Sequence, residues 1–164
     1  MKQAVVFYSQ NGNTRVAAQA MGKKFGADLF ELEEVKKRST NFFGFMYAGY
    51  SAGTGQRSEV KDTFAKEMKS YKKIYVGSPV WAAKAVPAVN TFLDALDVKG
   101  KEIVLFTVQA DQKDGPPSKG MAKLADALKA RGAKVSSVVR LSGAERMKDT
   151  VAAKDMKARV DAKM

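Results

Sequence analysis

Short runs of apolar residues, separated by turn residues, recur along the chain and predict β-strands. The first run, Gln3–Ser9, is rich in β-branched and aromatic residues, is too short for a helix and is followed by the turn pair Asn11-Gly12. The central runs are apolar almost throughout, which is typical of a parallel sheet covered on both faces. The five predicted strands are Gln3–Ser9, Asp28–Glu34, Lys73–Ser78, Glu102–Val108 and Lys134–Leu141.

Between these runs the apolar positions follow a helical period. From Asn13 onward, residues such as Val16, Ala20 and Met21 fall on one face, and Gly26 stands where a helix C-cap is expected. Phe64 and Met68 have the i, i+4 spacing of a second helix. After the helix that starts at Asn13, the predicted helices are Val60–Tyr71, which contains this pair, then Pro87–Leu96, Ser118–Arg131 and approximately Ala144–Ala162.

Strand and helix therefore alternate along the whole chain, without a linker rich in Gly, Pro or Ser. Right-handed crossovers restrict such a chain to a three-layer α/β fold with a doubly wound, five-stranded parallel sheet, most economically in the order 2-1-3-4-5. We expect a single domain over residues 1–164. Residues 35–58 interrupt the alternation as an excursion that is too long for a simple connection.

Composition narrows the chemistry that this fold can perform. The chain has no Cys and no His, which excludes disulfides, thiolate metal sites, a Cys nucleophile and the Ser-His-Asp triad. Redox or acid–base chemistry must come from carboxylates or a bound cofactor. No apolar run approaches the roughly 18 residues of a membrane span, and the chain opens on a strand pattern, so we expect no signal peptide and a cytoplasmic location.

Polar residues follow the first predicted strand and indicate an anion site. The segment Ser9–Thr14 contains hydroxyl and amide groups, and Gly12 lets the backbone curl closely around a ligand. The helix behind it presents free N–H groups, which favour phosphate. With one Gly and no Lys, the segment matches neither the dinucleotide fingerprint nor the Walker pattern. A polar turn that only caps the helix is the alternative interpretation.

Two further loops are expected at the same edge of the sheet, because the carboxyl ends of parallel strands lie together. Gly77–Ala82 follows the third strand and carries Trp81, the only Trp, whose ring suits stacking on an aromatic cofactor or packing the loop down. Gln109–Pro117 follows the fourth strand and offers backbone donors with the carboxylates of Asp111 and Asp114; a solvated turn is the alternative.

These segments resemble a known family. The sequence Val-Val-Phe-Tyr-Ser-Gln-Asn-Gly-Asn-Thr, ending at Thr14, is similar to the phosphate loop of flavodoxins, Ser/Thr-x-x-Gly-Asn-Thr. Gly77-Ser78-Pro79-Val80-Trp81, followed by Pro87-Ala88-Val89-Asn90-Thr91-Phe92-Leu93, resembles the second motif of flavodoxin-like domains. With the strand and helix spacing, the resemblance covers nearly the whole chain and implies a flavodoxin-like fold that binds FMN noncovalently.

The resemblance assigns a role to each loop. The first would hold the phosphate, the second would lie along the isoalloxazine, and the third would cover its pyrimidine edge. The implied cofactor-binding residues are Ser9, Gln10, Asn11, Gly12, Asn13 and Thr14 in the first loop, Ser78, Pro79, Val80, Trp81 and Ala82 in the second, and Gln109, Ala110, Asp111 and Gly115 in the third. No catalytic side chain and no metal ligand is expected. Asp111 and Asp114, if near the flavin, would oppose negative charge on the reduced ring and lower its potential.

The chain departs from electron-shuttling flavodoxins in two respects. Its third loop has no aromatic residue, and 29 Lys and Arg against 17 Asp and Glu give a net charge of +12, whereas such shuttles are usually acidic. We expect an FMN-dependent electron-transfer protein. An NAD(P)H- or quinone-dependent oxidoreductase and a non-redox module that has lost FMN are the alternatives. The charge favours an anionic redox partner protein or a quinone-type substrate at a negative membrane surface.

The excursion over residues 35–58 combines positive charge with aromatic rings. Its charged residues, Lys36, Lys37, Arg38 and Arg57, are all basic. Its aromatic residues are Phe42, Phe43, Phe45, Tyr47 and Tyr50. One hypothesis is a flap in which Tyr47 or Tyr50 closes over the flavin or forms a quinone pocket; the other is that the rings pack beside the sheet. Nucleic-acid binding is not expected, because no run of basic residues is long enough.

Overall fold

The computed structural model describes residues 1–37, 56–112, 115–146 and 148–164. A parallel sheet forms its centre, in the strand order β2-β1-β3-β5-β6. This confirms the predicted α/β fold and strand order. The strands are β1 (Gln3–Phe7), β2 (Asp28–Glu31), β3 (Lys73–Trp81), β4 (Lys84–Ala85), β5 (Glu102–Gln109) and β6 (Lys134–Ser142).

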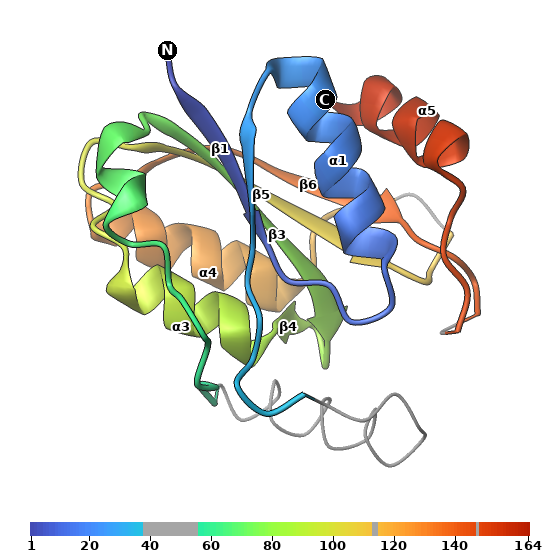
Figure 1. Cartoon of the computed structure of the whole chain (residues 1–164), viewed down its shortest axis with the longest axis horizontal. Helices are drawn as coiled ribbons and strands as arrows, with labels where there is room; N and C mark the ends of the chain where they lie inside the picture. The colour runs from blue at the N-terminus through green and yellow to red at the C-terminus, as the bar shows by residue number, and fades with distance from the viewer. Residues whose placement is uncertain (38–55, 113–114, 147) are drawn as a thin grey trace.

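Helices cover both faces of this sheet (Figure 1). On one face, Val5, Phe106 and Leu141 of the strands form an apolar cluster with Met21 of α1 and Met156 of α5. The other face packs against α3 and α4 in a second buried cluster. The helical elements are α1 (Asn13–Phe25), the short 3-10 helix η1 (Glu67–Ser70), α3 (Pro87–Ala95), α4 (Lys119–Ala130) and α5 (Ala153–Lys163). The arrangement has the three layers that the alternating pattern predicts.

The parallel register brings the predicted binding loops to one edge. Phe7 of β1 lies opposite Gly77 of β3, and Pro79 of β3 lies opposite Val108 of β5. Gly77 leaves no room for a side chain, because a Cβ there would lie 2.2 Å from the Phe106 ring. The three strands therefore end side by side, which places the segments that follow them at one edge of the sheet.

The predicted helix over Val60–Tyr71 is wrong except for the turn η1. The chain before η1 pairs instead with the segment that leaves β2: Val35 donates its N–H to Glu59, and Lys61 donates to Glu33. The Asp62 carboxylate accepts from the backbone N–H of Phe64, whose φ of 51° interrupts a right-handed helix. Met68 is nevertheless fully buried and Phe64 packs against the core, so their spacing reports burial but not a helix.

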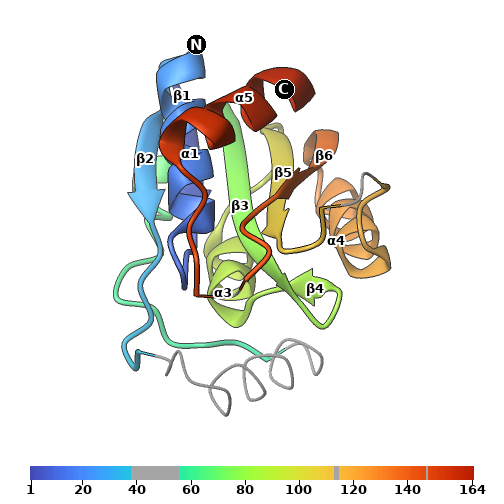
Figure 2. The same cartoon turned by 90° about the vertical axis from the view of Figure 1, so that its right-hand side faces the viewer.

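Two other boundaries differ from the sequence prediction. The last helix begins at Ala153 and not near Ala144, because the backbone groups of Ala144, Asp149 and Val151 are bonded to Asn13. The segment Gly77–Ala82 is mostly strand: β3 continues to Trp81 and pairs antiparallel with β4 (Figure 2). This hairpin adds a short sixth strand to the five parallel ones. Tyr47, Tyr50 and most of the excursion lie outside the described residues. No helix in the described ranges is long and apolar enough to cross a membrane.

Candidate functional site

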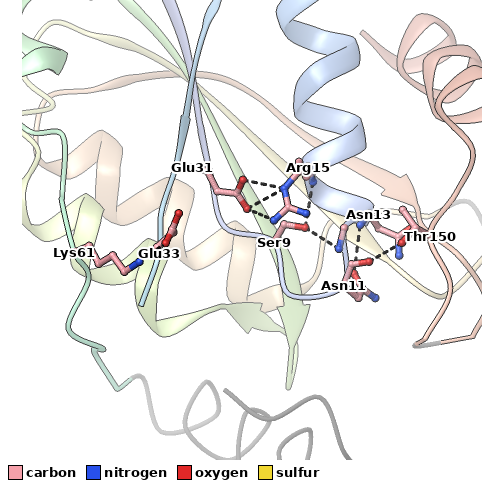
Figure 3. A network of polar contacts seen from close by, with 9 residues as sticks. Ser9, Asn11, Asn13, Arg15, Glu31, Glu33, Lys61 and Thr150 are labelled. Atoms are coloured by element: carbon pink, nitrogen blue, oxygen red, sulfur yellow. Dashed lines mark hydrogen bonds and ion pairs between the residues drawn. The ribbon is translucent and has the colours of Figure 1, made fainter. Parts of the chain in front are cut away.

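The first loop curls at the N-terminus of α1, as the sequence predicts. Gly12 takes a φ of 91°, a conformation that favours glycine. The Ser9 hydroxyl oxygen accepts hydrogen bonds from the backbone N–H groups of Gly12 at 3.1 Å and Arg15 at 3.2 Å (Figure 3). Two backbone donors therefore converge on one oxygen at the positive end of a helix. This donor set fits a phosphate oxygen, which is the group that the loop is expected to hold.

Asn13 performs a different task from the one that the sequence suggests. Its side chain is almost fully buried and donates to the carbonyl oxygen of Asp149 at 2.8 Å. Its amide oxygen accepts from the backbone N–H groups of Ala144 at 3.3 Å and Val151 at 2.8 Å. The Asn13 side chain is thus directed to residues 144–151, and it fixes that segment against the loop.

Thr150 is a residue of this loop region that the sequence analysis missed. Its hydroxyl donates to the carbonyl oxygen of Asn11 at 2.7 Å, and its side chain would lie 3.0 Å from a Cβ at Gly12. Nothing in the local sequence indicates this contact, because the segment was predicted to be helical. Thr14, predicted as a phosphate ligand, is buried at the start of α1.

The second predicted loop is the β3–β4 hairpin. Ala82 and Ala83 form its turn with φ of 47° and 62°, and Trp81 is the last residue of β3 before them. Ser78 is buried, and its hydroxyl donates to the Pro79 carbonyl and accepts from the N–H of Val86. Ser78 therefore fixes the path of the chain toward α3, whereas Pro79, Val80 and Trp81 are only partly buried at the rim.

The Trp81 ring packs against Tyr8, the residue that precedes the first loop. The two rings meet edge to face, with centroids 5.9 Å apart and planes at 87°. The Tyr8 hydroxyl donates to the buried carboxylate of Glu34 at 3.0 Å. The hairpin and the first loop are therefore joined through an aromatic contact.

The third loop contains an ion pair that changes its expected electrostatics. Asp111 lies 2.7 Å from the guanidinium of Arg140, a residue of β6 that the sequence analysis did not consider. The Gln109 amide oxygen, oriented as its donors require, accepts from the same guanidinium at 2.5 and 2.9 Å. Gly115 makes room, because a Cβ there would lie 3.1 Å from Arg140. Arg140 offsets the negative charge that we expected Asp111 to contribute; Asp114 lies outside the described residues.

The third loop is also tied to the segment that follows β6. Gly143 donates its N–H to the Gln109 carbonyl at 2.7 Å, and the Gln112 amide donates to the carbonyls of Ala110 and Gly143. The first and third loops thus share one neighbour, residues 143–151. Ala110 and Asp111 are exposed at this rim.

A hollow of about 330 Å³ lies beside the first loop, on the side of β2. Tyr8, Ser9 and Gln10 are among the residues that line it. Two lining residues, Arg15 and Glu31, make a forked ion pair with contacts of 2.6 to 3.2 Å, and the lining residue Glu33 pairs with Lys61 (Figure 3). Hydrogen bonding to Glu31 raises the pKa of Arg15, and hydrogen bonding from Lys61 lowers the pKa of Glu33. Arg15 is therefore committed to a carboxylate and is not directed at the loop.

Comparison with known structures agrees with this fold. A flavoprotein in complex with FMN from Lactobacillus acidophilus is 20% identical, with a TM-score of 0.65 over 85% of this chain and 92% of that one. A protein from Bacteroides uniformis, described provisionally as a flavoprotein, gives a TM-score of 0.74 at 20% identity over 98% and 97%. A flavodoxin from the domain Archaea gives 0.57 at 19% identity over 98% and 94%.

The structural neighbours share the fold at low sequence identity. A search of curated proteins found no match. The sequence model of a flavodoxin family, in contrast, matches residues 2–161, which is nearly the whole chain. The chain therefore belongs to the flavodoxin family.

Proposed function

We propose that the protein binds FMN at the carboxyl edge of its sheet and transfers electrons through it. The observation that carries this proposal is the turn at the start of α1, where the N–H groups of Gly12 and Arg15 point to one place, which the Ser9 hydroxyl oxygen fills and which a phosphate oxygen would take in its stead. The family match and the FMN complex of the Lactobacillus protein support the same cofactor. Bound FMN supplies an isoalloxazine that accepts and donates electrons.

The chain's own residues divide the remaining work. The first loop, Ser9–Thr14, binds the phosphate through backbone N–H groups and hydroxyls, and Asn13 and Thr150 keep that loop in shape. Pro79, Val80 and Trp81 would lie along the ring, and the edge-to-face contact with Tyr8 orients the Trp81 indole. Gln109, Ala110, Asp111 and Gly115 would line the polar end of the ring. None of these side chains has to move a proton, which agrees with a chain that lacks His and Cys.

Arg140 gives this site an electrostatic character of its own. Its guanidinium is largely buried, with 15% of the side chain exposed, and faces Asp111 and Gln109 in the third loop. A cation in this position favours the reduced flavin, which carries more negative charge than the oxidised form. In Arg140→Gln we expect affinity for reduced FMN to fall more than affinity for oxidised FMN. An unchanged ratio of the two affinities would place Arg140 outside the electrostatic reach of the ring.

The role as a carrier is tested by stopped-flow mixing. FMN-loaded protein, reduced by light, is mixed with a one-electron acceptor protein of acidic surface and, as a control, with a basic one. We expect fast reoxidation by the acidic acceptor that slows as salt is added, because the chain carries a charge of +12. Equal rates for both acceptors, or rates insensitive to salt, would contradict an anionic partner.

An oxidoreductase is the second candidate, favoured by the absence of an aromatic residue from the third loop, Gln109–Pro117. An uncovered ring face leaves room for a nicotinamide or quinone. Steady consumption of NAD(P)H with a quinone by the purified FMN-loaded protein, without a separate reductase, would favour this function over that of a carrier. A protein that is colourless, and is colourless again after FMN is added and the unbound FMN is removed, would identify a binding module without redox chemistry.

A further inference from the structure

A second pocket lies at the opposite end of the strands from the proposed flavin site. It has a volume of about 380 Å³ and is bounded by η1, the end of α3 and the turn that leads into β5. Figure 1 shows the turn of η1 lying near the C-terminal end of α3 at the amino edge of the sheet. The pocket is lined by the side chains of Lys66, Lys69, Lys99 and Lys101, by Asp97 and by the apolar Leu96.

The charge around this pocket is not balanced by the protein. Four lysines line it against one residue with a carboxylate, Asp97. Within the part of the chain that the structure describes, none of the four forms an ion pair with a carboxylate. The Asp97 carboxylate accepts from the backbone N–H of Lys99 and so helps to close the turn.

Lys101 is the buried lysine among the four that line the pocket. The residue is only 9% exposed, and its ammonium donates to the carbonyl oxygens of Met68 and Tyr71, both at 2.8 Å. Two of its three N–H bonds are thereby used. Burial lowers the pKa of Lys101, the nearby charge of Lys72 lowers it further, and the charge of Asp97 offsets part of this shift. A buried cation without a carboxylate partner is costly, and an anion in the adjoining pocket would relieve that cost.

The surroundings of the pocket reinforce its charge. The five segments that lead into the parallel strands, residues 1–3, 26–28, 66–73, 96–102 and 131–134, carry nine Lys and Arg against four Asp and Glu. Nearly half of the chain's net charge of +12 therefore lies at the amino edge. Such a field attracts anions and raises their local concentration.

We propose that this pocket binds a soluble anion that carries two linked phosphates, a pyrophosphate-type group. Four ammonium groups against one carboxylate leave an excess that a single monoanion cannot neutralise, whereas linked phosphates bring several charges on one compact group. The inference does not rest on the flavin site, which lies at the other end of the sheet.

The test is calorimetric titration of the full chain, saturated with FMN, with inorganic pyrophosphate. We expect binding of one pyrophosphate per chain that weakens between about 50 mM and about 200 mM salt. The triple variant Lys66→Gln, Lys69→Gln, Lys99→Gln should bind at least about tenfold more weakly, which corresponds to about 1.4 kcal/mol. These side chains are exposed, so the variant should fold, as circular dichroism would verify.

The matched control removes the same charge elsewhere. Lys119 and Lys123 on α4 and Lys154 on α5 are exposed lysines that form no ion pair in the described residues. Their triple substitution to Gln should leave pyrophosphate affinity unchanged. Equal weakening in both variants would mean attraction by net charge alone and would overturn the proposal. Absence of heat at millimolar pyrophosphate would also overturn it, as would lysine-dependent binding to vesicles with phosphate headgroups but not to pyrophosphate.

Discussion

Asn13 offers a direct test of how the first loop is held. The substitution Asn13→Ala deletes one donor and one acceptor that together make three hydrogen bonds to residues 144–151. The N–H of Val151 is buried and would lose its partner, at a cost of about 1–3 kcal/mol. The N–H of Ala144 is partly exposed and bonded at 3.3 Å, and the carbonyl of Asp149 belongs to an exposed residue, so water replaces much of both. We expect a loss of about 2–3 kcal/mol in the free energy of unfolding.

Urea denaturation measures this loss. With a slope of about 2 kcal/mol per molar, the midpoint should fall by about 1 M or slightly more. Asn90→Ala is the matched control, because the Asn90 side chain is partly exposed and makes no hydrogen bond among the described residues. Its midpoint should change by less than a quarter of that amount, since such surface substitutions stay within about 0.5 kcal/mol.

A second substitution separates stability from ligand binding. Asn13→Asp keeps an acceptor for the N–H groups of Ala144 and Val151, but it buries a carboxylate and replaces the donor to the Asp149 carbonyl with an acceptor, so it should also destabilise the chain. It also places a carboxylate beside the loop that we expect to bind phosphate, so the free energy of FMN binding should weaken by more than the free energy of unfolding falls. If Asn13→Ala were as stable as Asn90→Ala, the bonds to residues 144–151 would not hold the loop, and the reasoning would fail.

Three further substitutions test other parts of the molecule. Gly77→Ala places a Cβ 2.2 Å from the Phe106 ring and should lower the free energy of unfolding by more than about 3 kcal/mol, measured by urea denaturation. The control, Gly26→Ala, meets no atom within 4 Å and should cost only the strain of its φ of 61°, about 1–2 kcal/mol. Equal costs would contradict the close contact between Gly77 of β3 and Phe106 of β5. Trp81→Leu should weaken FMN binding about tenfold if the ring stacks, measured by quenching of flavin fluorescence, and an unchanged affinity would remove Trp81 from the site. Hydrogen bonding and charge from Lys73 lower the pKa of Glu102, so the pair adds stability above the ordinary value near 4.5 and loses it as pH falls through the lowered value. Glu102→Gln should therefore cost about 1 kcal/mol or less at pH 7 and almost nothing once the pH is below the lowered pKa, and a difference that does not change with pH would exclude the ionic contribution.

The strands and the first helix could be predicted because their signals are local. Runs such as Glu102–Val108 are apolar on both faces, and the helix that starts at Asn13 ends before Gly26, which has the φ of 61° of a left-handed cap. The order of the strands follows from right-handed crossovers, which depend on sequence order and not on side chains. Because the strands are parallel, their order also predicts the edge of the sheet at which the three loops meet.

Features that depend on distant partners could not be predicted in this way. The spacing of Phe64 and Met68 is compatible with a helix, but pairing with the chain beyond β2 takes precedence. The turn at Ala82 and Ala83 has positive φ without Gly or Asn, so the sequence gives no indication of the hairpin. Such hairpins are recognised in sequence by residues that tolerate positive φ, and neither alanine is one of them.

The electrostatic character of the third loop depends on register. Asp111 and Arg140 are separated by 29 positions, and they meet only because Thr107 of β5 lies opposite Arg140 of β6. The sequence of the third loop alone therefore predicts a negative site at Asp111, whereas in the folded chain this carboxylate is paired with the Arg140 guanidinium. The contacts of Asn13 and Thr150 with residues 144–151 have the same long-range origin.

The central claim is that the loop Ser9–Thr14 holds the phosphate of FMN, and a comparison of two flavins tests it most directly. Apoprotein is titrated with FMN and, separately, with riboflavin, which has the same ring but no phosphate, while quenching of flavin fluorescence is recorded. We predict binding of one FMN per chain at micromolar concentration or below, and binding of riboflavin at least about a hundredfold weaker, or about 2.7 kcal/mol. Equal affinity for the two flavins, or no binding of FMN, would contradict the account.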